Sequence, residues 1–189
     1  MLMTTHTRWL SLLAFALAAA LAACGKTQEA ASEKAAEKVI ESAMQKDGSK
    51  AKVDLSGGAM KVTTTDASGQ TSTAEFGAAK VSEAELGVPF YPGTQPLQGQ
   101  ATKISTGNGS AVTVVLHSDD TADKVAAFYR ERLKALSEGK QFMDMSGGDG
   151  HSTLMLADEK AKSAVQVHVI KADKGADIQI VASRENAAK

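Results

Sequence analysis

The sequence predicts an α+β fold, an antiparallel sheet with one long helix packed on one of its faces. Three observations lead to this prediction. Apolar residues recur with helical spacing between about Asp120 and Leu136, where Val125, Phe128 and Tyr129 share one face. The segments on both sides of this helix alternate apolar and polar residues, as half-buried strands do. Gly-rich or charged turns join those segments, which suits antiparallel pairing of neighbouring strands.

Two strands are expected before the helix and four after it, which gives the order ββαββββ. The expected strands cover about Leu97–Ser105, Ala111–Leu116, Gln141–Met145, Thr153–Ala157, Ala164–Ile170 and Ile178–Ser183. In the fifth of these, three valines alternate with Gln166 and His168. One face of the sheet is therefore expected to be at least partly wet.

A second helix is predicted over Glu29–Lys46, where Val39 and Ile40 contribute to a thin apolar stripe. Its glutamates at 29, 33, 37 and 41 form one line at i,i+4 spacing, along which like charges repel slightly. A helix this polar needs a packing partner. It is either a spacer that lies on its own domain or a helix that binds another protein. Residues 50–77 then alternate as two or three short strands with little apolar content, typical of an edge or a small ribbon.

The three prolines lie within Pro89–Pro96 and mark the expected boundary between a small N-terminal unit and the main domain. The predicted organisation has five parts. They are a signal peptide at 1–23, a lipidated tether and helix at 24–48, a β-rich unit at 49–85, a main α+β domain at 86–184 and a tail at 185–189.

The first 23 residues have the three parts of a secretory signal peptide. Arg8 and the amino terminus supply the positive charge, and an apolar run from Trp9 to Ala23 follows and ends in small residues. The run is shorter than the roughly 20 residues that a membrane-spanning helix needs. A cleaved leader is therefore predicted instead of a permanent transmembrane anchor.

The only cysteine of the chain follows directly on this run. Leu21-Ala22-Ala23-Cys24 resembles the lipobox of bacterial lipoproteins, a Leu and two small residues before Cys. The resemblance implies cleavage before Cys24, a diacylglyceryl thioether on its thiol with acyl chains such as palmitate, and attachment to a membrane. Gly25, in place of Asp, implies delivery to the outer membrane, facing the periplasm, in a bacterium with two membranes. With no other thiol, the mature chain forms no internal disulfide.

A second resemblance lies in the segment Val88-Pro89-Phe90-Tyr91-Pro92-Gly93, which a hairpin and a helix containing Phe128-Tyr129 follow. This arrangement resembles a group of uncharacterised bacterial lipoproteins with a V-P-x-Y-P-G segment. It covers about Leu86 to Ala182 and implies an address and an architecture but no activity. Phe90 and Tyr91 have two interpretations: they plug the bottom of the sheet, or a rigid exposed turn presents them to a partner.

The run His117–Asp120 has the residue types of a metal site, but a helix N-cap at Ser118 or Asp120 explains it better. Neither a calcium-binding nor a catalytic pattern is complete around His151, so a hairpin loop is expected there. His168 falls on the solvated side of its strand. The nucleotide-binding, zinc-protease and serine-hydrolase motifs are missing from the sequence, and no catalytic or metal-binding residue and no cofactor are predicted.

Charge and composition bear on partners. The chain has 21 basic and 22 acidic side chains and a formal net charge of −1, without the basic excess of nucleic-acid-binding proteins. The expected function is a membrane-anchored lipoprotein that acts as a non-enzymatic binding or adaptor module, with an envelope protein as a candidate partner. The alternative is an envelope hydrolase or small-ligand carrier with a site built from scattered residues such as His117, His151 and Asp149.

Overall fold

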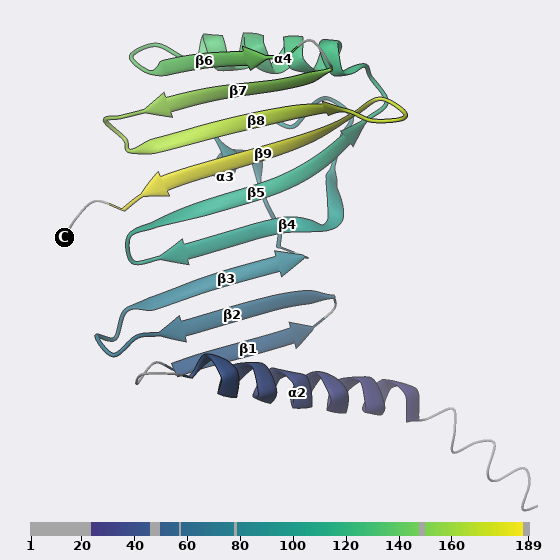
Figure 1. Cartoon of the computed structure of the whole chain (residues 1–189), viewed down its shortest axis with the longest axis vertical. Coiled ribbons are helices and arrows are strands. Elements are labelled where there is room, and N and C mark those ends of the chain that lie inside the picture. Colours follow the sequence, from purple (N-terminus) through teal and green to yellow (C-terminus); the bar gives the residue numbers. More distant parts are fainter. Residues whose placement is uncertain (1–23, 46–49, 57, 78, 148–149, 187–189) are drawn as a thin grey trace, which may run out of the picture.

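The computed structural model describes residues 24–45, 50–56, 58–77, 79–147 and 150–186, so the signal peptide predicted at 1–23 lies outside the described residues. The described strands form one antiparallel sheet of nine, in the order β1-β2-β3-β4-β5-β9-β8-β7-β6 (Figure 1). Three helices accompany the sheet in this part of the chain. The predicted α+β class, an antiparallel sheet with helices, is confirmed at this level.

The elements have the following bounds. The strands are β1 (Lys50–Ser56), β2 (Ala59–Thr65), β3 (Thr71–Gly77), β4 (Pro96–Thr106), β5 (Gly109–Ser118), β6 (Gln141–Ser146), β7 (His151–Asp158), β8 (Ser163–Lys171) and β9 (Ala176–Glu185). The helices are α2 (Cys24–Met44), α3 (Glu83–Leu86) and α4 (Ala122–Ala135). In chain order, β4 and β5 precede α4, and β6 to β9 follow it.

The sheet continues without a break across the boundary that the sequence places at residue 86. β3 pairs with β4 in antiparallel register from Thr73↔Ser105 to Gly77↔Ala101. The strands of the predicted N-terminal unit and those of the predicted main domain therefore belong to one hydrogen-bonded sheet. The proline-containing segment lies in the connection from α3 to β4, on the face of the sheet that carries α4 (Figure 1).

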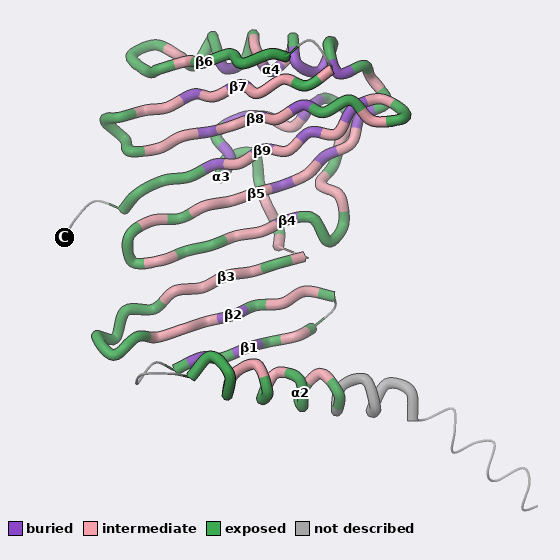
Figure 2. The backbone as a smooth tube through the Cα atoms, viewed as in Figure 1, coloured by how far each residue is buried: buried purple, intermediate pink, exposed green. Residues whose placement is uncertain are grey.

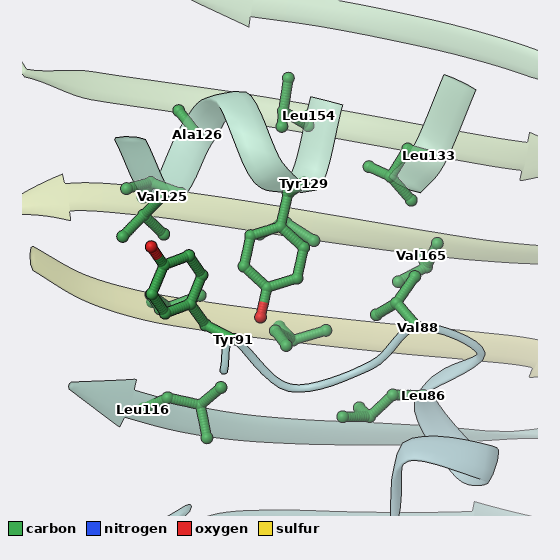
Figure 3. Close-up of a cluster of buried hydrophobic side chains, with 14 of the residues drawn as sticks. Leu86, Val88, Tyr91, Leu116, Val125, Ala126, Tyr129, Leu133, Leu154 and Val165 are labelled. Atoms are coloured by element: carbon green, nitrogen blue, oxygen red, sulfur yellow. The ribbon is translucent and has the colours of Figure 1, made fainter. Parts of the chain in front are cut away.

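The core lies between one face of the sheet and a cover made of α4 and the segment 86–91 (Figures 2 and 3). Alternate residues of the central strands point into it, and the residues between them are half-buried on the opposite face. The strand residues of the core are Val114, Leu116, Leu154, Leu156, Val165, Val167, Val169, Ile178, Ile180 and Ala182. The strands thus bury one face and leave the other partly wet, as the alternation predicts.

Only part of the predicted apolar stripe of α4 is buried. Val125, Tyr129 and Leu133, spaced at i,i+4, face the sheet, whereas Phe128 is half-buried and Leu136 is 42% exposed. The spacing predicts Phe128 at the centre of the helix–sheet interface together with Tyr129, and this is wrong: Tyr129 takes that place. The reason is geometric: when one i,i+4 ridge faces the sheet, positions at i+3 turn toward the rim of the contact.

The N-cap of α4 is Thr121, whose hydroxyl accepts a hydrogen bond from the Lys124 N–H at 3.4 Å. The predicted caps, Ser118 and Asp120, are thus wrong. Ser118 instead accepts a hydrogen bond from the Asp120 N–H at 3.1 Å and closes the turn that leads into the helix.

The edge strand β1 is covered by α2. The Val53 and Leu55 N–H groups, which point outward from the sheet, donate to the carboxylates of Glu41 and Glu37, each at 2.8 Å. The Gln45 side-chain amide donates to the Ala51 carbonyl at 3.4 Å. One helical turn of four residues rises about 6 Å, close to the roughly 6.7 Å that two strand residues span. The i,i+4 line of glutamates therefore fits the alternate outward N–H groups of an edge strand, and α2 lies on its own domain.

Replacing Glu37 or Glu41 with alanine is expected to loosen α2 from β1, because each change leaves one edge N–H without its acceptor. A hydrogen bond to a charged group contributes about 1.5–3 kcal/mol, and partial exposure brings this toward the lower end. We expect hydrogen exchange of the Val53 or Leu55 amide, whichever has lost its acceptor, to accelerate about tenfold. Lys38→Ala, on the exposed side of the helix, is the control. Unchanged exchange at both amides would contradict the pairing.

Candidate functional site

A groove opens on the face of the sheet that carries α4. Its volume is 610 Å³, within the range of about 300–1,000 Å³ typical of ligand pockets. The sheet forms the floor. Residues 84–87 of α3 and its C-cap form one wall, and Leu136, just after α4, forms part of the other. The groove exists because α4 packs mainly over β6 to β9 and leaves the rest of this face to the short α3 and the segment after it.

Two neighbouring rows of side chains make the floor, and each row takes one residue from each of β3, β4, β5, β9, β8 and β7. The antiparallel register places paired residues on the same face. The first row is Glu75, Lys103, Val112, Ala182, Val165 and Leu156. The second row is Thr73, Ser105, Ser110, Arg184, Ser163 and Asp158. Six strands at about 4.8 Å spacing give the floor a length of about 24 Å.

The first row is apolar over four of its six positions. Val112, Ala182, Val165 and Leu156 continue the core outward, and Leu86 of α3 lies 2% exposed beside them. On the opposite wall, Leu136 is a large apolar side chain that is exposed. The groove therefore has an apolar strip on its floor and an exposed apolar side chain, Leu136, on one wall.

Two ion pairs lie at the rim. Lys103 Nζ contacts Glu85 Oε1 at 2.6 Å, and Lys140 Nζ lies 3.9 Å from Asp158 Oδ2. The Lys103 hydrogen bond, helped by the backbone and hydroxyl of Ser82, lowers the pKa of Glu85 to about 2. Because this value lies below the ordinary 4.5 of a glutamate, the contact stabilises the fold above about pH 4.5. That stabilisation is lost as the pH falls toward 2.

The second row is polar, and its central groups have no partner. Within the described residues, the Arg184 guanidinium forms no ion pair or hydrogen bond, nor do the hydroxyls of Ser110 and Ser163. These two serines are the direct cross-strand neighbours of Arg184, on β5 and β8. The row thus places one cation between two hydroxyl groups, next to the apolar row.

Tyr91, predicted either as core or as a partner surface, is 6% exposed and lies in the core. Its hydroxyl donates to Asp120 Oδ2 at 2.6 Å, and its ring meets the Phe128 ring edge-on at 5.2 Å. Burial, followed by the Asp120 contact, raises the pKa of the Tyr91 phenol. Phe90 is half-buried against the same core. Both rings take the positions of the first interpretation, in which they plug the sheet.

The structure does not bring the scattered histidines together. His117 is on β5, and its Nδ1 lies 2.7 Å from Asp177 Oδ1 of β9. His168 is on β8, and its Nδ1 lies 3.0 Å from Thr153 Oγ1 of β7. His151 is on β7, three strands from β5, a distance of about 14 Å. All three lie on the face opposite the groove, because their strand neighbours point into the core. Asp149 lies outside the described residues.

Cys24 is the first residue of α2, and its side chain lies outside the described part of the chain. Among the described residues, no three His, Cys, Asp or Glu side chains are placed to share a metal ion. The same residues contain no helix with the length and apolarity to cross a membrane. No family model, no curated protein and no solved structure matches this chain.

Sequence reasoning missed the groove, although a signal for it exists. In each central strand, the every-second-residue pattern of core positions ends in a polar residue on the same face. These residues are Ser110 before Val112, Ser163 before Val165, and Arg184 after Ala182. A polar residue in phase with the core indicates a place where the buried face of a sheet becomes accessible.

Proposed function

We propose that this chain is a lipid-anchored protein of the cell envelope that acts as a non-enzymatic binding module, with the groove as its binding site. Most of the site lies on the ββαββββ arrangement from β4 to β9 with α4, and β3 and α3 complete it. The lipobox resemblance at Cys24 supports the anchor. The observation that carries the binding function is the floor of two rows, apolar beside unpaired polar groups.

The shape of the site favours a small ligand over a protein partner. Sites for small molecules are concave and combine apolar surface with placed polar groups, and the groove sets an apolar row beside a polar one. The apolar turn at Phe90 and Tyr91 lies against the core, where it offers little contact area to another protein. Within the binding class, we therefore propose a small-ligand carrier rather than an adaptor.

Leu136→Asp tests this function. The change puts a charge on the groove wall, so we expect at least a tenfold loss of affinity for an uncharged apolar probe such as N-phenyl-1-naphthylamine, measured by its fluorescence. Because Leu136 is 42% exposed, the fold should be kept. Ile170→Asp is the matched control, since Ile170 is 41% exposed on the other face of the sheet. Equal loss in both variants, or no probe binding in the parent chain, would refute the groove as a binding site.

Cys24→Ser tests the anchor. Without the thiol no thioether lipid can form, and each buried methylene of such a lipid contributes about 0.8 kcal/mol of membrane affinity. We expect the variant to leave the membrane fraction or to accumulate as uncleaved precursor, which detergent phase partitioning and gel mobility will show. Normal processing with retention in the membrane would contradict the lipobox. Gly25→Asp extends the test, because the proposed delivery to the outer membrane should then fail in a host with two membranes.

A further inference from the structure

We propose that the groove binds an amphiphile with a single anionic head group, a carboxylate or a phosphate ester on an alkyl or acyl chain. The head lies on the second row, at Arg184, Ser110 and Ser163, and the chain lies on the apolar part of the first row. This inference rests on the proposed binding function and adds the chemical class of the ligand.

The charges in the groove favour an anion. The lysines that line it are already paired, Lys103 with Glu85 and Lys140 with Asp158. Glu75 of the first row is paired as well, with Lys61 Nζ at 2.7 Å. Within the described residues, Arg184 is the one lining cation without a carboxylate partner. An anion from solution would satisfy it without breaking an existing pair.

The donors around Arg184 suit a group with two or three oxygens. A guanidinium presents several N–H donors in a planar fork that matches a carboxylate or phosphate. Cross-strand neighbours have Cβ atoms about 4.5–5.5 Å apart, so Ser110 and Ser163 flank the base of the Arg184 side chain, and a head group bound by the guanidinium can fold back toward their hydroxyls. Each hydroxyl can donate one further hydrogen bond.

The apolar row lies next to these donors. Ser110 precedes Val112, Ser163 precedes Val165 and Arg184 follows Ala182, each by two residues. Two strand residues span about 6.7 Å, the distance of a few methylene groups. A head group on the second row therefore brings the start of its own chain onto the first row. Leu136, which is exposed, then covers the chain from one wall.

Binding of decanoate tests the inference, with decyltrimethylammonium as the same chain under the opposite charge and inorganic phosphate as an anion without a chain. The protein is the mature chain from residue 24 with Cys24→Ser, which keeps every described element. For each compound, the displacement of bound N-phenyl-1-naphthylamine is measured by fluorescence. Binding of inorganic phosphate is also measured by calorimetry. We expect decanoate to bind at least tenfold more tightly than the cationic amphiphile, and Arg184→Gln to remove that preference.

Lys174→Gln is the matched control, because it removes the same charge from the exposed turn between β8 and β9, at the opposite end of β9. If the preference for decanoate over the cationic amphiphile is lost in Arg184→Gln and kept in Lys174→Gln, the anionic site is supported. Equal binding of both amphiphiles, with loss in Leu136→Asp, overturns the anionic class but leaves the proposed binding function intact. No displacement by any amphiphile overturns the inference, and if the naphthylamine also fails to bind, the proposed function fails with it.

The source of the amphiphile is addressed by a second arm in which lysophosphatidylglycerol, a single-chain membrane lipid with a phosphate head, replaces decanoate. Tighter binding of the lysolipid indicates a ligand drawn from the membrane to which Cys24 tethers the chain. Tighter binding of decanoate indicates a free fatty carboxylate. In either case the affinity must fall in Arg184→Gln. If Arg184→Gln binds both the lysolipid and decanoate as tightly as the parent chain does, the inference is overturned.

Discussion

Replacing Tyr129 with alanine is expected to lower the free energy of unfolding by about 3–5 kcal/mol, the cost of emptying a large core site. Tyr129 is completely buried and, among the described residues, is the largest of the fully buried side chains. It enters the core from the middle of α4, and its ring lies between the helix, the sheet and the segment that carries Tyr91 (Figure 3). Urea unfolding followed by circular dichroism will measure the loss.

Two further variants make this expectation specific. Phe128→Ala should cost less, because Phe128 is half-buried and its outer side contacts Arg132, whose guanidinium carbon lies 5.2 Å from the ring centroid. Tyr129→Phe should be close to neutral, because the Tyr129 hydroxyl is buried beside the Tyr91 backbone without a hydrogen bond of good geometry. Burial also raises the pKa of this phenol. If Phe128→Ala were the more destabilising change, α4 would present a different face to the sheet.

The class of fold could be predicted from the sequence because the patterns that indicate it are local. Alternation in segments such as 164–170 and the helical spacing of Val125 and Tyr129 depend only on neighbours along the chain. Which of the two rings, Phe128 or Tyr129, is the buried one could not be predicted from the sequence. Both belong to the same apolar stripe, and only the orientation of α4 against β6 to β9 decides which one points inward.

The polar residues in phase with the core signal an accessible place in each strand, but which of them meet in one groove could not be predicted, because that depends on non-local register. Ser110, Arg184 and Ser163 meet only when β9 inserts between β5 and β8, strands whose pairing brings together residues far apart in the sequence. A shift of one residue in either pairing would turn Arg184 to the opposite face. The same holds for Glu37 and Glu41: the sequence shows a line of like charges, and only the position of β1 gives them their N–H partners.

Gly175→Ala is expected to destabilise the protein by roughly 2–5 kcal/mol, from a left-handed backbone and a steric overlap together. Gly175 lies in the turn between β8 and β9 with φ +73°. A Cβ at this position would meet the Ser118 carbonyl oxygen at 1.9 Å and the Asp119 Cα at 2.8 Å. Ser118 is buried and pairs with Ala176, so the backbone of β5 cannot move away without breaking the β5–β9 pairing.

Gly93→Ala separates the two contributions. Gly93 has nearly the same backbone conformation, with φ +79°, but no heavy atom lies within 4 Å of the position of a Cβ there. Its substitution should therefore cost only the backbone strain, about 1–2 kcal/mol. The difference in unfolding free energy between the two variants measures how closely the turn after β8 approaches the end of β5. Because that contact fixes β9 against β5, it also fixes the register on which Ser110 and Arg184 meet. Equal losses in the two variants would mean that the turn does not touch β5, and that the register needs another cause.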